Sequence, residues 1–368
     1  MRHHIDQLET PVPLVDLDIM DHNLDRMATY AKEHGLGLRP HIKTHKSPRV
    51  GREQVRRGAV GLTCATLREA EVMADLTDDI LIAYPPVGEP KLRRLMALPS
   101  HVRPMVALDS AESVDGLAAA AKEHGRTIRV LVELDFGMHR VGVPSSDHAL
   151  ALAQRVVAAP PLEFAGINFY PGHIRETVDK QGLSLTKLNA DLLEVLTTFE
   201  RAGIKPGIVS GGSTPTAFQT HQIKGLTEFR PGTYVYNDRS TVAIGACQRT
   251  DCAFTVLATV VSTSVPGQAV VDAGAKALGR EPRDIEQTGF GELLDHPEVT
   301  VRGMSEEHGV LDLSKSAWKP KVGDLVRIIP NHVCIVVHLN DFIYGVRGEM
   351  VETAWPVAAR GRAPAAVV

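Results

Sequence analysis

The sequence contains no apolar run approaching the roughly 20 residues that a membrane-spanning helix needs. Its N-terminus also lacks the basic-then-apolar pattern of a secretion signal. These absences predict a cytoplasmic protein with no membrane partner. Cysteine is scarce as well: four scattered residues in a chain of 368 argue against a disulfide framework.

The chain has no excess of positive charge. Its formal net charge is -4, which argues against nucleic acid or an anionic membrane as a partner, because both bind basic surfaces. A hydrophobic content of 43% and a charged content of 23% are typical of a globular protein. A length of 368 residues favours two domains.

The first two thirds of the chain alternate predicted strands with predicted helices. An extended segment over residues 10–18 is followed by a helix that Asp21 is expected to cap and that ends at Gly35. A first strand then carries Lys43, and seven more are expected over 61–66, 79–84, 105–109, 128–135, 164–170, 208–212 and 229–236. Helical spacing fills several of the gaps, for example over 110–123, 148–158 and 186–202. The sequence therefore predicts an α/β fold, a (β/α)8 TIM-type barrel over residues 19–245.

Beyond residue 245 the helical periodicity gives way to short strands with turn residues between them. Strands are expected over 255–261, 269–272, 299–302, 325–329, 334–339 and 343–346. This change predicts a second, mostly-β domain over residues 246–368, which the N-terminal segment 1–18 is expected to join.

In a barrel of this type the active site lies at the C-terminal ends of the strands. Polar residues follow several of the predicted strands at that end, and they would gather on one rim. This shared location is stronger evidence for a site than any single motif. The residues are Lys43, His45, Glu133, Asp135, Arg140, Tyr170, His173, Ser210 to Thr214, and Arg230 to Tyr234.

The stretch from Arg39 to Lys46 has two lysines and two histidines. On a strand, alternation would direct Lys43 with the polar set and Lys46 to the opposite face. An amine among other cationic groups loses its proton more readily, which favours imine formation. Lys43 is therefore a candidate Schiff-base lysine. On this stretch alone a solvated turn or an anion patch remains an alternative.

The segment Gly211-Gly212-Ser213-Thr214 is expected to open a helix after the seventh strand. Its backbone N–H groups and two hydroxyls suit an anion, and barrels commonly bind phosphate after strands seven and eight. The alternative is a tight turn, which needs the same glycines. A reactive lysine together with a phosphate cradle indicates pyridoxal phosphate.

Two arginines on the predicted rim, Arg140 and Arg230, stay charged at any working pH. Either could pair with the phenolate of this cofactor or lie against its ring nitrogen. The alternative for each is a structural ion pair with Glu133 or Asp135.

The segment His332-Val333-Cys334 is a candidate metal site. If it lies on a strand, His332 and Cys334 share a face, and an imidazole with a thiolate suits zinc. At about 3.3 Å per residue His338 would then lie roughly 20 Å from His332, too far to join. Two protein ligands leave positions open for water or substrate, as in a catalytic site. The alternative is a buried cysteine beside a capping histidine.

Four motifs together give the chain a specific resemblance. They are Pro40-His41-Ile42-Lys43-Thr44-His45-Lys46, Ser210-Gly211-Gly212-Ser213-Thr214-Pro215-Thr216, Arg230-Pro231-Gly232-Thr233-Tyr234 and Pro330-Asn331-His332-Val333-Cys334. The combination resembles the family of D-threonine aldolases and D-serine dehydratases, fold-type III pyridoxal phosphate enzymes built like alanine racemase. The resemblance extends over nearly the whole chain.

The resemblance implies an alanine racemase-like barrel with a C-terminal β domain, and a homodimer. Lys43 matches the lysine that binds the cofactor, and Arg140 matches the arginine that reaches its phenolic oxygen. His332 and Cys334 match a zinc pair, with Mn²⁺ or Mg²⁺ as alternative metals. The expected catalytic residues are Lys43, His173 and Tyr170. The expected cofactor-binding residues are Lys43, His41, Arg140, Tyr170, Ser210, Gly211, Gly212, Ser213, Thr214, Arg230, Gly232, Thr233 and Tyr234.

Two departures separate the chain from the aldolases of that family. They usually carry His-x-Asp at the metal site, where this chain has Cys334. They also have a histidine directly after the strand-six tyrosine, whereas here Pro171 follows Tyr170 and the histidine is His173. Both differences weaken the aldolase interpretation without excluding it, because His173 could take that role.

The resulting hypothesis is a lyase acting on a D-amino acid with a β-hydroxyl group. Lys43 would remove the α-proton, and the metal would make the β-hydroxyl a better leaving group, giving a 2-keto acid and ammonia from a D-serine-like substrate. Chelation is then expected to abolish turnover with the cofactor still bound. The rivals are aldol cleavage to glycine and an aldehyde, an amino-acid racemase, and a non-catalytic pyridoxal phosphate carrier.

Overall fold

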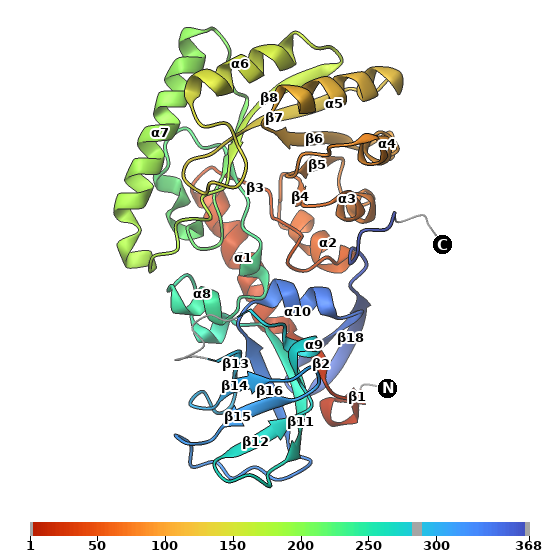
Figure 1. Cartoon of the computed structure of the whole chain (residues 1–368), viewed down its shortest axis with the longest axis vertical. Coiled ribbons are helices and arrows are strands. Elements are labelled where there is room, and N and C mark those ends of the chain that lie inside the picture. Colours follow the sequence, from red (N-terminus) through yellow and green to blue (C-terminus); the bar gives the residue numbers. More distant parts are fainter. Residues whose placement is uncertain (1–2, 282–288, 365–368) are drawn as a thin grey trace. The chain divides into compact units, whose positions relative to one another are not determined.

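The computed structural model describes residues 3–281 and 289–364, and the chain forms two compact units (Figure 1). One unit comprises Arg26–Lys43, Pro48–Gly232 and Ala359–Val368. The other comprises Met1–Asp25, Thr44–Ser47 and Thr233–Ala358. The units alternate along the chain, so no single cut in the sequence separates them.

The first unit is built on a sheet of eight parallel strands. Their spatial order is β3-β10-β9-β8-β7-β6-β5-β4. A parallel bridge between His41 and Thr63 joins the first edge to the last, and Thr63 N donates to Pro40 O at 2.9 Å. The sheet therefore closes on itself, which confirms the predicted (β/α)8 barrel. The strands are β3 (Gly37–Leu38), β4 (Leu62–Cys64), β5 (Asp79–Ile82), β6 (Arg103–Leu108), β7 (Ile128–Leu134), β8 (Leu162–Phe169), β9 (Ile208–Gly211) and β10 (Glu228–Phe229).

Helices follow most of these strands along the outside of the barrel (Figure 1). Three of them begin at a hydroxyl cap, where Thr66, Ser110 and Ser145 each accept the N–H of the residue three positions on. The helices are α2 (Pro48–Arg56), α3 (Leu67–Met73), α4 (Glu89–Met96), α5 (Ala111–Glu123), α6 (Ser146–Val157) and α7 (Gly182–Arg201), with short 3₁₀ helices η2 (Val178–Lys180) and η3 (Ala217–Gln222).

The barrel strands approach each other closely at Gly166 in β8. Its φ is +152°, and a Cβ there would lie only 1.9 Å from the carbonyl oxygen of Ile208 in β9. Glycine is therefore required at this position. Four side chains from three neighbouring strands form a fully buried apolar cluster in this unit: Leu81, Met105, Ala107 and Leu131.

The structure corrects two predicted strands at the barrel rim. The first strand is short, so Lys43 lies in a turn rather than on the strand, and the predicted eighth strand ends at Phe229. Pro40 and Pro231 explain both endings, because proline has no N–H to continue a ladder. The residues Thr233–Val235 form a 3₁₀ helix, η4, instead of strand.

Two predicted helix starts are also corrected. Helix α1 (Leu17–Glu33) begins four residues before Asp21, because Asp16 Oδ1 accepts the N–H groups of Asp18 and Ile19 at 3.0 Å. Asp16, rather than Asp21, therefore caps this helix. The helix expected after the seventh strand is the six-residue 3₁₀ helix η3.

The second unit is built on a sheet of ten strands. Within it, β11 (Phe254–Ser262) pairs with both β12 (Gln268–Val271) and β16 (Leu325–Pro330), so six strands close into a small antiparallel barrel. The N-terminal strand β2 (Val12–Asp16) lies in the same sheet, between β11 and β17 (Phe342–Arg347). The prediction lacked four strands of this sheet: β1 (His3–His4), β13 (Gly291–Leu293), β15 (Gly309–Asp312) and β18 (Met350–Pro356). It had located β14 (Thr300–Met304).

The strand predicted over 334–339 is wrong, because these residues belong to helix α10 (Val333–Leu339). Its buried residues, Val333, Val336 and Val337, recur at helical spacing. The run of β-branched residues favoured a strand, but burial of one helical face decides the structure. The unit also contains α8 (Arg239–Ala243), α9 (Ala275–Leu278) and the 3₁₀ helix η5 (Arg249–Asp251).

No helix within 3–281 or 289–364 combines the length and the apolar character that crossing a membrane requires.

Candidate active site

Three of the predicted site residues meet around one aromatic ring at the barrel rim. The Nζ atom of Lys43 lies 5.6 Å from the centre of the Tyr170 ring, and Cζ of Arg140 lies 4.9 Å from the same centre. Lys43 is half-buried in the turn that follows β3, and its backbone N–H donates to His41 Nδ1 at 3.4 Å. Tyr170 directly follows β8. The turn thus presents the amine beside residues from two other loops.

Arg230 is buried and held by neutral acceptors. Its Nη1 donates to Ser210 Oγ at 2.6 Å, and its Nη2 donates to the carbonyl oxygen of Phe169 at 2.8 Å. Ser210 Oγ in turn donates to Glu228 Oε1 at 2.6 Å. Burial lowers the pKa of the Arg230 guanidinium, although Glu133 and Glu228 oppose this. The side chain is therefore fixed in place before any ligand binds.

Glu133 lies on β7 with only 5% of its surface exposed. Burial raises the pKa of this carboxyl group, while Arg230 and Arg140 act to lower it. Its neighbour in register on β8 is Asn168, which is fully buried and whose side-chain hydrogen bond with Glu133 also acts to lower that pKa. A carboxyl group and an amide buried side by side make this end of β7 and β8 polar, as a polar ligand group would need.

The glycine-rich loop after β9 is compact and rich in hydroxyl groups. Gly212 has φ +79°, and a Cβ on Gly211 would lie 2.3 Å from the Phe169 ring, so both glycines are required by local packing as well. Ser213 and Thr214 are buried, and Thr214 Oγ1 accepts the N–H of Gly232 at 3.2 Å. The structure brings this loop and Gly232 together, as a phosphate cradle would need.

Thr233 and Tyr234 are not grouped with these barrel residues. Both belong to the second unit, where they open η4, and Tyr234 is buried there. Their predicted cofactor contacts stay predictions.

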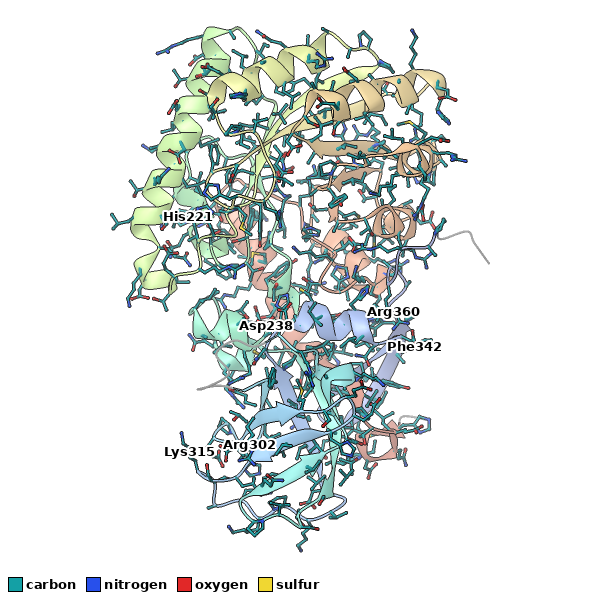
Figure 2. The ribbon with its side chains drawn as sticks, viewed as in Figure 1. His221, Asp238, Arg302, Lys315, Phe342 and Arg360 are labelled. Atoms are coloured by element: carbon teal, nitrogen blue, oxygen red, sulfur yellow. The ribbon has the colours of Figure 1, made fainter. Side chains whose placement is uncertain are left out.

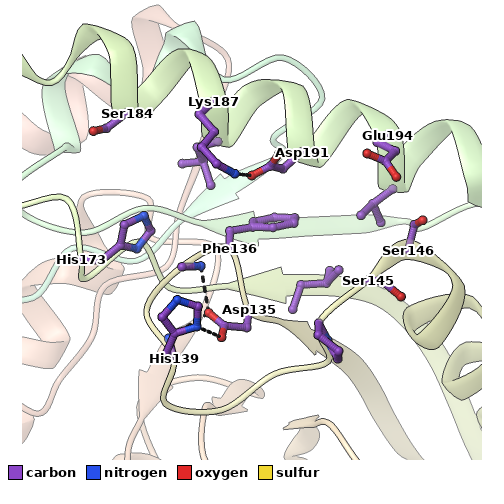
Figure 3. A pocket seen from close by; sticks show the side chains of 15 residues that line it. Asp135, Phe136, His139, Ser145, Ser146, His173, Ser184, Lys187, Asp191 and Glu194 are labelled. Atoms are coloured by element: carbon purple, nitrogen blue, oxygen red, sulfur yellow. Dashed lines mark hydrogen bonds and ion pairs between the residues drawn. The ribbon is translucent and has the colours of Figure 1, made fainter.

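His173 lines a separate cavity of about 540 Å³ on the barrel unit, shown in Figure 3. A Cβ on Gly137 would lie 3.2 Å from His173 Nε2, so the ring packs against the loop after β7. Lys43 and Tyr170 are not among the described residues that line this cavity. The sequence did not indicate the contribution of helix α7, which supplies Ser184, Lys187, Leu188, Asp191, Glu194 and Val195.

Asp135 shapes one wall of this cavity. Its Oδ1 accepts the N–H groups of Gly137 and His139 at 2.9 and 3.0 Å, and its Oδ2 lies 3.0 Å from His139 Nδ1 (Figure 3). Burial alone would raise the pKa of Asp135, but the hydrogen bonds from His139 and Gly137 lower it overall. Asp135 is therefore engaged within its own loop and not in an ion pair with Arg140.

The predicted metal ligands lie at the start of α10. His332 is the N-cap residue and Cys334 is in the first turn, so the argument from a shared strand face is wrong. His338 is six residues along a helix, about 9 Å rather than 20 Å from His332, and it is exposed. Cys334 Sγ lies 3.2 Å from Oγ1 of Thr44, the residue that follows Lys43 in the sequence.

The cap geometry nevertheless brings the imidazole and the thiol together. Burial by itself lowers the pKa of His332, but hydrogen bonds with Asp238 and with Cys334 outweigh it and raise the pKa to about 11. Nitrogen and sulfur donors are the ligand set that zinc prefers. The described residues contain no cluster of three or more histidine, cysteine or acidic side chains suited to a metal, so a metal here would have two protein ligands and open positions.

Comparison with known proteins supports this assignment of the fold. A family model described as "Alanine racemase, N-terminal domain" matches residues 15–240, and one described as "Putative serine dehydratase domain" matches residues 253–346. The chain is 32% identical over 369 residues to 3-hydroxy-D-aspartate aldolase of Paracoccus denitrificans strain Pd 1222, covering 97% of this chain and 93% of that protein.

Two solved structures resemble the chain over nearly its full length. D-threonine aldolase from Filomicrobium marinum is 34% identical with a TM-score of 0.88, and 97% of each chain is covered. A cysteine-to-alanine mutant of D-threo-3-hydroxyaspartate dehydratase in its metal-free form is 30% identical with a TM-score of 0.88, covering 98% of this chain and all of the other.

The fold, with the family model that matches residues 15–240, defines a protein of the alanine racemase class. Within that class the chain belongs to the family of D-threonine aldolases, hydroxyaspartate aldolases and dehydratases, and D-serine dehydratases, and it is a pyridoxal-phosphate-dependent lyase.

Proposed function

We propose that the enzyme uses a divalent metal beside pyridoxal phosphate to dehydrate and deaminate a D-serine-like substrate, giving a 2-keto acid and ammonia. The observation that carries the proposal is the amine of Lys43 beside the ring of Tyr170, which Arg140 also contacts, at the C-terminal rim of the barrel. An amine in this position could act as a base on an amino acid bound at the rim.

The residues around this amine fit pyridoxal phosphate. When bound, the cofactor supplies an electron sink for the charge left at the substrate Cα. The hydroxyl-rich loop after β9 suits its phosphate, and buried Arg230 suits its ring. The residues that would hold it are Lys43, His41, Arg140, Tyr170, Ser210, Gly211, Gly212, Ser213, Thr214, Arg230, Gly232, Thr233 and Tyr234.

Lys43 is the proposed base, because its Nζ is the amine that the rim presents and its side chain is half-buried. Tyr170 would keep the amine in place through its ring face. Arg230 is the residue that would face the cofactor ring, and its hydrogen bonds to Ser210 and Phe169 hold its guanidinium in one position.

His332 and Cys334 are the proposed metal ligands, and zinc is the metal their donor atoms favour. A metal with only two protein ligands retains positions for a substrate hydroxyl, which it would make a better leaving group. A cysteine at this place supports dehydration, because the aldolases that the chain resembles usually carry an aspartate there. A related hydroxyaspartate dehydratase has been solved as a cysteine-to-alanine mutant in a metal-free form. We propose zinc, with Mn²⁺ and Mg²⁺ as alternatives, and a homodimer as the working assembly.

Aldol cleavage to glycine and an aldehyde is the second candidate. The similarity to 3-hydroxy-D-aspartate aldolase and to D-threonine aldolase, each over more than nine tenths of the chain, favours it. In that reaction His173 is the candidate base for the β-hydroxyl.

A product assay separates the two reactions. The enzyme loaded with pyridoxal phosphate and Zn²⁺ is incubated with D-serine, D-threonine and D-threo-3-hydroxyaspartate, and keto acid, ammonia, glycine and aldehyde are measured. Keto acid with equimolar ammonia supports the proposal. Glycine with an aldehyde would replace it with aldol cleavage, and racemisation without either product set would overturn both.

A further inference from the structure

Asp238, Arg239 and Ser240, a short segment of the second unit, form hydrogen bonds with the residues on both sides of His332. Arg239 Nη1 donates to Asn331 Oδ1 at 2.6 Å, and Ser240 donates to the carbonyl oxygen of Asn331 through Oγ at 2.7 Å and through its N–H at 3.2 Å. Asp238, the residue before them, contacts His332 itself. The segment 238–240 therefore holds the segment 331–333, which contains His332, in place.

Asp238, labelled in Figure 2, has a carboxylate with no exposed surface and four donor contacts. Its Oδ1 accepts the N–H of Thr241 at 2.9 Å and the Thr241 hydroxyl at 3.2 Å, which caps α8. Its Oδ2 accepts the N–H of Val333 at 3.1 Å and lies 3.3 Å from His332 Nδ1. One buried carboxylate thus caps two helices and touches the candidate metal ligand.

The orientation of the imidazole follows from this contact. The Nδ1 edge of His332 faces the buried carboxylate, while about a third of the side chain, 33%, remains exposed. A carboxylate can only accept hydrogen bonds, so when a metal replaces one ring proton, the proton that stays is the one on Nδ1. The lone pair of Nε2 is then left for a metal.

We propose that Asp238 is the positioning residue of the metal site: by accepting the Nδ1–H of His332 it sets both the tautomer and the ring plane that present Nε2 to the metal. The proposal rests on the metal site of the proposed function. Carboxylates behind metal-binding histidines act in this way, and their loss commonly weakens metal binding by about 10- to 100-fold.

The test compares Zn²⁺ affinity, by competition with a chromogenic chelator, in the wild-type enzyme, D238N and T241V. The variant T241V is the matched control, because it removes one hydroxyl from the same helix cap and leaves the contact between Asp238 and His332 in place. We expect D238N to bind Zn²⁺ about 10- to 100-fold more weakly. We expect T241V to stay much closer to wild type, because the hydrogen bonds between the Thr241 hydroxyl and Asp238 lie within the helix cap and none of them involves His332.

The outcomes separate the two claims. If wild type binds no Zn²⁺, the proposed metal site itself is wrong. If wild type binds Zn²⁺ and D238N binds it equally well, or T241V is weakened as much as D238N, the metal site stands and the role of Asp238 is overturned. The visible spectrum of bound Co²⁺ gives a second signal, since a turned imidazole alters it in D238N and not in T241V.

A measurement on the wild-type enzyme covers the case in which D238N does not fold. In enzyme labelled with ¹⁵N-histidine and loaded with ¹¹³Cd²⁺, scalar coupling identifies the metal-bound ring nitrogen, and comparison with H332A assigns it. Coupling to Nε2 with a protonated Nδ1 supports the proposal. Coupling to Nδ1 would overturn it, because that nitrogen could not also donate to Asp238.

Discussion

The amine of Lys43 lies 5.6 Å from the centre of the Tyr170 ring, in a turn that begins after Pro40 has ended the barrel strand. Arg140, an exposed residue, reaches the same ring from the loop after β7 with its Cζ at 4.9 Å. The Tyr170 ring is therefore shared by an amine and a guanidinium that come from two different loops.

We expect K43A to lower turnover by about 10²- to 10⁴-fold, because a positioned base contributes this much to proton transfer. The variant should also lose the visible absorbance of covalently bound cofactor. Spectra and keto-acid formation measure the two effects. The exposed Lys224 gives the control, and K224A should match wild type in both. A K43A enzyme with normal turnover would remove Lys43 from the mechanism.

Removal of the metal is expected to stop turnover while the cofactor stays bound. The reason is that all the candidate cofactor residues except Thr233 and Tyr234 lie on the barrel unit, whereas His332 and Cys334 belong to the other compact unit. No residue is a candidate ligand of both the cofactor and the metal. Dialysis against a chelator, followed by absorbance and activity measurements, tests this, and Zn²⁺, Mn²⁺ and Mg²⁺ are added back separately. Full activity in metal-free enzyme contradicts the role of the metal. Loss of cofactor on chelation contradicts the independence of the two sites.

His173 should matter more for aldol cleavage than for dehydration. Its ring lines the cavity beside Gly137 and Asp135, which Lys43 and Tyr170 do not line, so in aldol cleavage it would turn toward Tyr170 to take the hydroxyl proton. We expect H173A to reduce glycine formation from D-threonine by about 10²-fold or more, with a smaller effect on keto acid from D-serine. The ratio of the two products is the measurement. Equal loss of both would indicate that His173 acts on substrate binding, and no loss of either would exclude it from catalysis.

The sequence predicted the barrel well because the strands are short buried runs that end in polar residues. It placed Lys43 and Cys334 on strands, whereas the structure has Lys43 in a turn and Cys334 in a helix. In both cases neighbouring residues decide the conformation against the alternating strand pattern. Pro40 removes the N–H that a longer strand would need. At 334–339, the β-branched residues favour a strand, while burial of Val333, Val336 and Val337 on one side favours a helix.

Other parts of the site depend on contacts between residues far apart in the chain, which local sequence patterns cannot predict. Asp238 and His332 are 94 positions apart, and only the folded sheet brings them within 3.3 Å. The spacing of Asp238 and Thr241 does indicate a helix cap, so the start of α8 could be predicted from the sequence. The contact between Asp238 and His332 could not. The cavity beside His173 likewise depends on α7, whose polar residues look like an ordinary solvated helix face in the sequence.

A buried ion network holds the barrel together beneath the site. Asp79 Oδ1 accepts Arg39 Nη1 at 2.6 Å and Arg129 Nη2 at 2.9 Å, and Arg39 Nε continues to Glu228 at 2.8 Å. Burial alone would raise the pKa of Asp79, but the contacts with Arg129 and Arg39 outweigh it and lower the pKa. Glu228 also accepts the hydroxyl of Ser210, so the network reaches the residue that holds Arg230.

We expect D79N to be less stable than wild type by about 3–5 kcal/mol at pH 7, because the change leaves two arginines without their shared partner. A lowered pKa in the folded state means that the stabilising contribution is fully present above the unfolded pKa of about 3.9 and is lost as the pH falls through the folded value. Urea unfolding should therefore show the same difference at pH 7 and pH 5, and a smaller one below about pH 4. The control is D115N, which breaks a pair with Arg155 at the surface and should change stability far less. A difference that stays constant down to pH 3 would show that Asp79 acts through packing rather than through its charge.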